Sequence, residues 1–162
     1  MKSWGNSVVE DRATGQARPG ARMPLELSGR LHLITAHEVE ELRSALAHGR
    51  LPADLEAKLA KLAGGSLSER YVAQNSRLIY ELLLASLEGS FTAATRADRE
   101  RLLRVLAYVR KDDDAFPDYL PGGFIDDQQE VRAAAAELGR LLQAFKAWRL
   151  LHQVPAMWRC QA

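Results

Sequence analysis

Residues 66–89 read SLSERYVAQNSRLIYELLLASLEG and predict the helix around which the rest of the chain packs. Ser66 and Glu69 have the spacing of a capping box, in which the two side chains satisfy amide groups at the start of a helix. Gly89 is the residue type that most often follows a helix end. The second half of the segment is apolar over most of the helix circumference, which is typical of a helix with neighbours on several sides. These apolar residues are Leu78, Ile79, Leu82, Leu83 and Leu87.

Two shorter helices are predicted before this segment. Thr35 and Glu38 form another capping-box pattern, and the helix that they begin ends just before Gly49. The next helix opens at Pro52, a residue type favoured in the first turn, and stops at the Gly-Gly pair at 64–65. One apolar stripe along it consists of Leu51, Leu55, Leu59 and Leu62.

Two further helices are predicted after the central segment. Thr95, with Asp98 three residues later, caps the fourth. Asp127, with Glu130 at the same spacing, is expected to cap the fifth, which ends near Gln153 just before a proline. The fifth helix is expected to be continuous because apolar residues recur along it at helical spacing: Val131, Ala135, Leu138, Leu142 and Phe145.

These elements predict an all-α fold, a single small helical bundle of about five helices with a flexible N-terminal arm. Residues 1–29 contain several glycines and prolines and no helical stripe, and we expect them to form that arm. Residues 30–155 form the expected helical domain, and residues 156–162 a C-terminal tail. The length of 162 residues is typical of one domain.

Composition narrows the classes of function. Lysine and arginine number 22 against 21 aspartates and glutamates, so the net charge of +1 gives no general attraction to nucleic acid or to an anionic membrane. Cys160 is the one cysteine, which excludes an internal disulfide. No run of about 18 apolar residues predicts a membrane span, and no signal-peptide pattern occurs. We therefore expect a cytoplasmic protein.

The stretch DDDAFPDYLPGGFIDD, residues 112–127, predicts an ordered corner between the fourth and fifth helices. Pro121 and Gly122 suit the central positions of a type II turn. Its aromatic and aliphatic side chains, including Phe124 and Ile125, are expected to fold back onto the two helices. The residues to which we assign a structural role in the corner are Pro117, Pro121, Gly122, Gly123, Asp126 and Asp127.

The same stretch resembles the core motif of the YkvA-like family, small bacterial domains of unknown function. The matching positions are Tyr108, Asp114, Pro117, Asp118, Pro121, Gly123, Asp126 and Asp127. The resemblance extends from the fourth helix into the fifth and implies a helical fold, while the family brings no established activity. The chain departs from the family pattern after Asp127, where polar residues 128–130 replace the usual apolar ones.

The acids at the start of the corner need a partner. They follow the C-terminus of a helix, where the helix dipole disfavours each negative charge by about 0.3–1 kcal/mol. Nearby cations such as Arg110, Lys111 or Arg132, a divalent cation, or a basic partner surface would offset this cost. Candidate metal ligands are Asp112, Asp114 and Asp118. They are weak candidates, because their spacing does not fit a calcium-binding loop. No cofactor-binding motif occurs, and we expect no cofactor.

The C-terminal segment has the opposite charge. Residues 132–162 contain five basic residues and one acidic residue, together with Trp148 and Trp158. Tryptophan and arginine are favoured anchors at protein interfaces. Our first hypothesis is therefore a non-enzymatic helical protein-interaction module. Its candidate contact residues are Asp112, Asp113, Asp114, Asp118, Trp148 and Arg149.

Two alternatives stay open, and the sequence leaves the oligomeric state undetermined. The first is a divalent-metal-dependent enzyme or metal sensor that uses Asp112, Asp113, Asp114 and Asp118. The second is a nucleic-acid-linked regulator that uses the arm, in which KSWGNS at residues 2–7 resembles the opening of MazE-type antitoxins. Nucleic acid ranks below a protein partner because basic and aromatic residues do not gather on one face.

Overall fold

The computed structural model describes residues 30–112 and 123–152 of the chain, and the regular elements among these residues are all helices, with no strand. They form one short 3-10 turn and six α-helices. In chain order these are η1 (Leu31–Leu33), α1 (Ala36–Ala47), α2 (Ala53–Ala63), α3 (Leu67–Leu87), α4 (Arg96–Arg110), α5 (Ile125–Glu137) and α6 (Gly139–His152). The predicted arm and tail lie outside the described residues.

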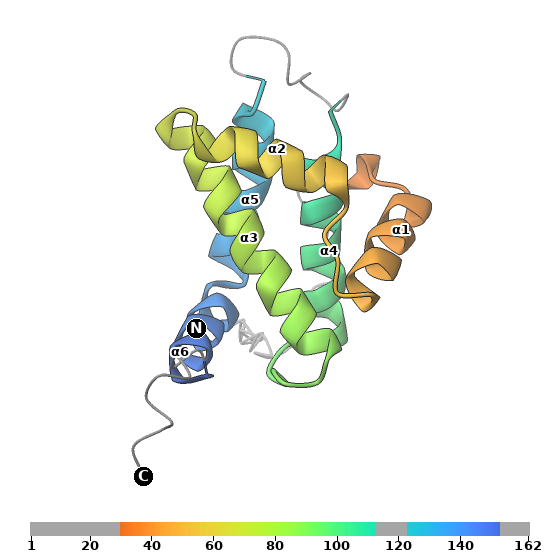
Figure 1. Ribbon diagram of the computed structural model, residues 1–162, viewed down its shortest axis with the longest axis vertical. Helices are drawn as coiled ribbons and strands as arrows, with labels where there is room; N and C mark the ends of the chain where they lie inside the picture. The colour runs from red at the N-terminus through yellow and green to blue at the C-terminus, as the bar shows by residue number, and fades with distance from the viewer. Residues whose placement is uncertain (1–29, 113–122, 153–162) are drawn as a thin grey trace, which may run out of the picture.

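Helix α3 is the centre of the bundle, as its sequence predicts. It contacts α1, α2, α4, α5 and α6. In Figure 1 the helix α2 crosses one end of α3, while α1 and α6 lie on opposite sides of the molecule. The residues Ile79, Leu82 and Leu83 are almost fully buried, so the broad apolar surface of α3 is covered by its neighbours.

The predicted capping boxes are confirmed at three helix starts. Thr35 with Glu38 begins α1, Ser66 with Glu69 begins α3, and a similar pair begins α4. In each box the side chain of the first residue accepts a backbone hydrogen bond, and the later carboxylate reaches back to the first residue's amide. The box at α4 consists of Thr95 and Asp98.

Two glycines end helices in the left-handed region of the backbone. Gly49 has a φ of +67° after α1, and Gly89 has a φ of +78° after α3. Side chains other than hydrogen are disfavoured at these angles, so a glycine permits the chain to turn sharply at both places. These turns direct α2 and α4 back across the bundle.

The predicted fifth helix is wrong in two respects. The chain bends at Leu138, so the segment forms two helices, α5 and α6, and the described residues contain six α-helices, close to the predicted number of about five. The residue at the start of α5 is Phe124, without a side-chain cap, while Asp127 lies inside the first turn and is buried. Asp127 therefore does not cap the helix, because its carboxylate is used in a contact with another helix.

Two smaller expectations also change. Pro52 precedes α2 as its N-cap residue, one position before the helix begins. Ile125 is 53% exposed instead of folding back onto the helices, whereas Phe124 packs against the core as expected. None of the described helices is long and apolar enough to cross a membrane.

Candidate functional site

A buried polar cluster lies where α2, α4 and α5 meet, and it consists of Lys58, Tyr108, Asp126, Asp127 and Glu130. Lys58 comes from α2, and its Nζ lies 3.3 Å from Oδ2 of Asp127 on α5. The same ammonium group donates a hydrogen bond of 3.0 Å to the backbone carbonyl of Lys111, just after α4. The Lys58 and Asp127 side chains are 7% and 0% exposed. One lysine thus joins three helices inside the molecule.

Asp126 makes the second connection within the buried polar cluster. The hydroxyl of Tyr108 on α4 donates a hydrogen bond of 2.9 Å to Oδ2 of Asp126, and both side chains are buried. The other oxygen of Asp126 accepts a hydrogen bond from the amide of Asp127 at 3.1 Å. The adjacent acids therefore have separate partners on α4 and α2.

Glu130 completes the buried polar cluster one turn further along α5. Its Oε1 accepts a hydrogen bond of 2.7 Å from the backbone amide of Arg30, which holds the start of the described chain against α5. Its Oε2 is buried without a hydrogen-bond partner among the described residues. Burial of a polar atom without a hydrogen-bond partner is costly, so Glu130 brings a free-energy cost as well as a contact to the cluster.

The sequence contains a signal for this cluster that none of the predictions above used. Lys58 lies three residues after Leu55 and four before Leu62, on the apolar stripe of α2. Glu130 lies next to Val131 on the buried face of α5. A charged residue at a core position of a helical stripe indicates a buried partner of opposite charge, because an unpaired buried ion is strongly disfavoured.

Of the predicted acidic contact residues, only Asp112 lies within the described part of the chain. Its side chain is 82% exposed, and its Oδ1 lies 3.7 Å from Nζ of Lys58. The cation nearest to this negative charge therefore comes from α2 and not from a residue of α4. Gly123 is buried in the turn before α5. The remaining residues named for the corner, Asp113, Asp114, Pro117, Asp118, Pro121 and Gly122, lie outside the described residues.

The metal hypothesis has no support from the described helices. Residues 30–112 and 123–152 contain no group of three or more histidine, cysteine, aspartate or glutamate side chains placed to hold a metal ion. The metal candidates Asp114 and Asp118 are outside these ranges. A metal site therefore stays a prediction.

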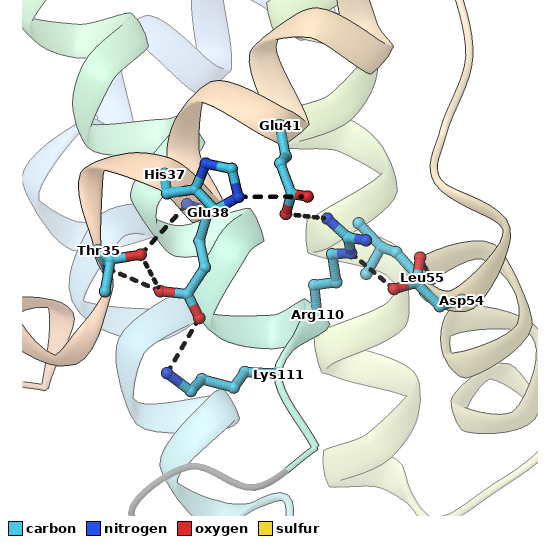
Figure 2. A network of polar contacts seen from close by, with 8 residues as sticks. All are labelled: Thr35, His37, Glu38, Glu41, Asp54, Leu55, Arg110 and Lys111. Carbon is cyan, nitrogen blue, oxygen red and sulfur yellow. Dashed lines mark hydrogen bonds and ion pairs between the residues drawn. The ribbon is translucent and has the colours of Figure 1, made fainter.

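A groove of about 190 Å³ lies between α1 and α2, with the end of α4 beside it. Figure 2 shows the charged side chains at this place. Arg110 donates from Nε to Oδ2 of Asp54 at 2.7 Å, and its Nη1 lies 3.8 Å from Oε2 of Glu41. The ring nitrogen Nε2 of His37 lies 3.7 Å from the other oxygen of Glu41. The carboxylates of this groove thus face cationic or polar groups.

Two carboxyl groups beside the groove are held in their ionised form. Burial acts to raise the pKa of Glu38, but hydrogen bonds from Thr35 and the ion pair with Lys111 at 3.0 Å outweigh it, and the net pKa is lowered. Burial also acts to raise the pKa of Asp54, and the hydrogen bond from Arg110 lowers it overall. Because both groups have a lowered pKa, neither suits the role of a proton donor near neutral pH.

The predicted contact residues Trp148 and Arg149 hold α6 against the bundle. Trp148 is half-buried and stacks on Phe145 with ring centres 5.6 Å apart. Phe91, in the loop after α3, meets both rings edge-on at 5.2 and 5.7 Å. Arg149 donates a hydrogen bond of 2.5 Å to Glu81 on α3. These two residues position α6, and their side chains are engaged inside the molecule.

The opposite side of α6 is open to solvent, and we call it the outer face of α6. Leu150 and Leu151 are each 76% exposed. The other exposed residues of this face are Arg140, Gln143, Ala144, Lys146 and Ala147. Sequence reasoning missed the two leucines because it followed the apolar stripe through Phe145, and neither leucine continues that stripe.

A scan against protein-family models, a search of curated proteins and a search of solved structures each found no match to this chain. The resemblance to the YkvA-like family therefore stays a prediction, and function is argued from the residues themselves.

Proposed function

We propose that this protein is a non-enzymatic helical module that binds another protein through the outer face of α6. The observation that carries the proposal is the exposure of Leu150 and Leu151, each 76% open to solvent on the same short helix. Full burial of a leucine side chain contributes about 1.5–3 kcal/mol. Two adjacent exposed leucines therefore offer a partner a substantial part of the free energy that a specific complex requires.

The attachment of α6 supports the same proposal. Phe91, Phe145 and Trp148 pack against one another beneath the helix, and Arg149 bonds to Glu81 on α3. A binding surface that is already fixed before association loses less conformational freedom on binding. The inner side of α6 thus holds the outer face in place for a partner.

The other polar features favour structural roles. The buried polar cluster ties helices together through Lys58, Asp126 and Tyr108, whose side chains are almost closed to solvent. Beside the groove between α1 and α2, Glu38 and Asp54 have lowered pKa values and are paired with cations. The Tyr108 hydroxyl and the Asp126 carboxylate lie side by side but are only 0% and 2% exposed, so neither arrangement offers a substrate an accessible nucleophile beside a general base, which an enzymatic alternative would need.

Site-specific photo-crosslinking in cells of the source organism tests the proposal. A photoreactive amino acid at Ala147, on the outer face of α6, should form a discrete adduct with another protein. The same amino acid at Ala57, an exposed position on α2, serves as the matched control. The adduct should disappear when Leu150 and Leu151 are both changed to serine, while circular dichroism shows that the helices persist. Equal labelling from Ala147 and Ala57 would contradict the proposal.

A further inference from the structure

We infer that the partner presents to the outer face of α6 a helix whose contacting side is acidic towards one end and apolar towards the other. This inference rests on the proposed function and adds the chemistry of the partner. The first observation is charge: α6 contains Arg140, Lys146 and Arg149 and no acidic residue. Arg149 bonds to Glu81. Arg140 and Lys146 are exposed and have no ion-pair partner in the described part of the chain, so carboxylates of a partner can reach both.

The second observation is the order of side chains along the outer face. At 3.6 residues per turn, Arg140, Ala144, Ala147 and Leu151 follow one line along the helix, and Gln143, Lys146 and Leu150 follow the line beside it. In each line a cationic residue comes before a leucine in the sequence. The remaining residues of the two lines are alanines and one glutamine. From residue 140 to residue 151 the rise is about 16 Å, which a helix of about three turns covers.

This order determines what a complementary helix must carry. It needs carboxylates opposite Arg140 and Lys146, and apolar side chains opposite Leu150 and Leu151. Alanines at the centre of the face allow the backbone of the partner to approach closely. A helix whose contacting face carries acidic side chains towards one end and apolar side chains towards the other meets all three needs.

A second copy of this chain fits the outer face poorly. Parallel pairing of two α6 helices would bring Arg140 and Lys146 of one copy beside the same cations of the other. Antiparallel pairing would place these cations against leucines and leave them without carboxylates. Like charges across an interface are strongly disfavoured, so charge argues for a different molecule.

An anionic membrane surface is also a weaker fit. A helix that lies in a membrane interface inserts a broad apolar face. Here the large apolar side chains of the outer face are confined to Leu150 and Leu151, near the end of the helix, while Gln143 and two alanines occupy the middle. The small apolar area of the outer face therefore matches the side chains of one partner helix better than it matches a membrane interface.

Synthetic peptides test the inference directly on the full chain. The probe is a labelled helical peptide with one face that carries glutamates towards one end and leucines towards the other, and the control peptide has lysine in place of every glutamate. By fluorescence anisotropy, the acidic peptide should bind at least about tenfold more tightly than the basic one, since like charges oppose association. The preference should weaken between about 50 mM and about 500 mM salt, because salt screens exposed charges.

Charge reversal supplies the decisive variant. The double change Arg140→Glu and Lys146→Glu should reverse the preference between the two peptides, whereas Lys61→Glu, at an exposed position on α2, should leave it unchanged. Equal binding of both peptides by the unaltered protein would overturn the inference. So would binding to vesicles of phosphatidylcholine and phosphatidylglycerol, lost on the double change, without peptide binding.

The two proposals fail in different ways. If crosslinking from Ala147 still yields an adduct while the acidic peptide has no advantage, the acidic character of the partner is wrong and the interaction module stands. If Ala147 gives no adduct above the Ala57 control, the proposed function itself is wrong. Binding of the acidic peptide would then show only that the face can bind such a helix, without a partner in the cell. The inference about the partner would be wrong together with the proposed function.

Discussion

Replacement of Lys58 by methionine should strongly destabilise the fold. Methionine matches the length of the lysine side chain closely, so the change mainly removes the ammonium group that lies 3.3 Å from Asp127 and 3.0 Å from the carbonyl of Lys111. Removal of one partner of a buried ion pair costs about 3–5 kcal/mol, because the other charge stays buried. A domain of this size is typically stable by about 5–15 kcal/mol, so one side chain accounts for a large share.

Chemical denaturation followed by far-UV circular dichroism measures this loss. The matched control is Lys61→Met on the same helix, where the side chain is exposed and the change should alter the free energy of unfolding by less than about 0.5 kcal/mol. The melting temperature of Lys58→Met should fall by roughly 10 °C, given about 2–4 °C for each kcal/mol in a domain of this length. A loss below about 1 kcal/mol would show that Asp127 does not depend on Lys58.

A double-mutant cycle separates the ion pair from the other contacts of Lys58. The change Asp127→Ala, made alone and together with Lys58→Met, completes the cycle, and the double variant should recover part of the lost stability because the carboxylate that Lys58→Met leaves buried is then removed. Recovery should be incomplete because the carbonyl of Lys111 still lacks its donor. Additive losses in the double variant would refute the reasoning, because coupled neighbours should deviate from additivity by about 0.5–3 kcal/mol.

Four further substitutions test individual contacts and backbone angles. Tyr108→Phe should cost about 1.5–3 kcal/mol in denaturation, because it removes a buried hydrogen bond to the carboxylate of Asp126; an unchanged midpoint would contradict this. The pKa of Glu38 is lowered from its ordinary 4.5, so Glu38→Gln should cost about 0.5 kcal/mol at neutral pH, and the difference should vanish as pH falls through that lowered pKa, as melts across pH would show. Gly139→Ala should stabilise by about 0.4–1 kcal/mol, since its added Cβ meets open space. Gly49→Ala should instead destabilise by about 1–2 kcal/mol because of its positive φ; equal melting shifts for the two glycine variants would refute the comparison.

Local signals in the sequence predicted most of the helix starts and ends. Capping boxes such as Thr35 with Glu38, and glycines such as Gly49, act on backbone groups within a few residues, so the pattern is visible in one short stretch. The central position of α3 was also predictable, because its apolar surface is too broad for a helix at the edge. Local chemistry was sufficient for these features.

Contacts between distant segments were not predictable in this way. Asp127 has the spacing of a helix cap, yet its carboxylate is buried against Lys58 of α2. Gly139 follows the bend at Leu138, and glycine is the residue type that most often follows a helix end, so a local signal for the break was present and was not used. Beyond the bend, Phe145 and Trp148 reach Phe91. For Asp127, a partner far away in the sequence competes with the local preference and prevails. The outer face of α6 became apparent only once that bend was known.

The packing of Phe91 has a consequence for how the protein is made. Phe91 is only 5% exposed because Phe145 and Trp148 cover it. Synthesis proceeds from the N-terminus, and domains begin to fold as they emerge. The ring of Phe91 is therefore uncovered in any nascent chain from which α6 has not yet emerged. Such a chain would present an exposed aromatic surface to chaperones and to neighbouring chains.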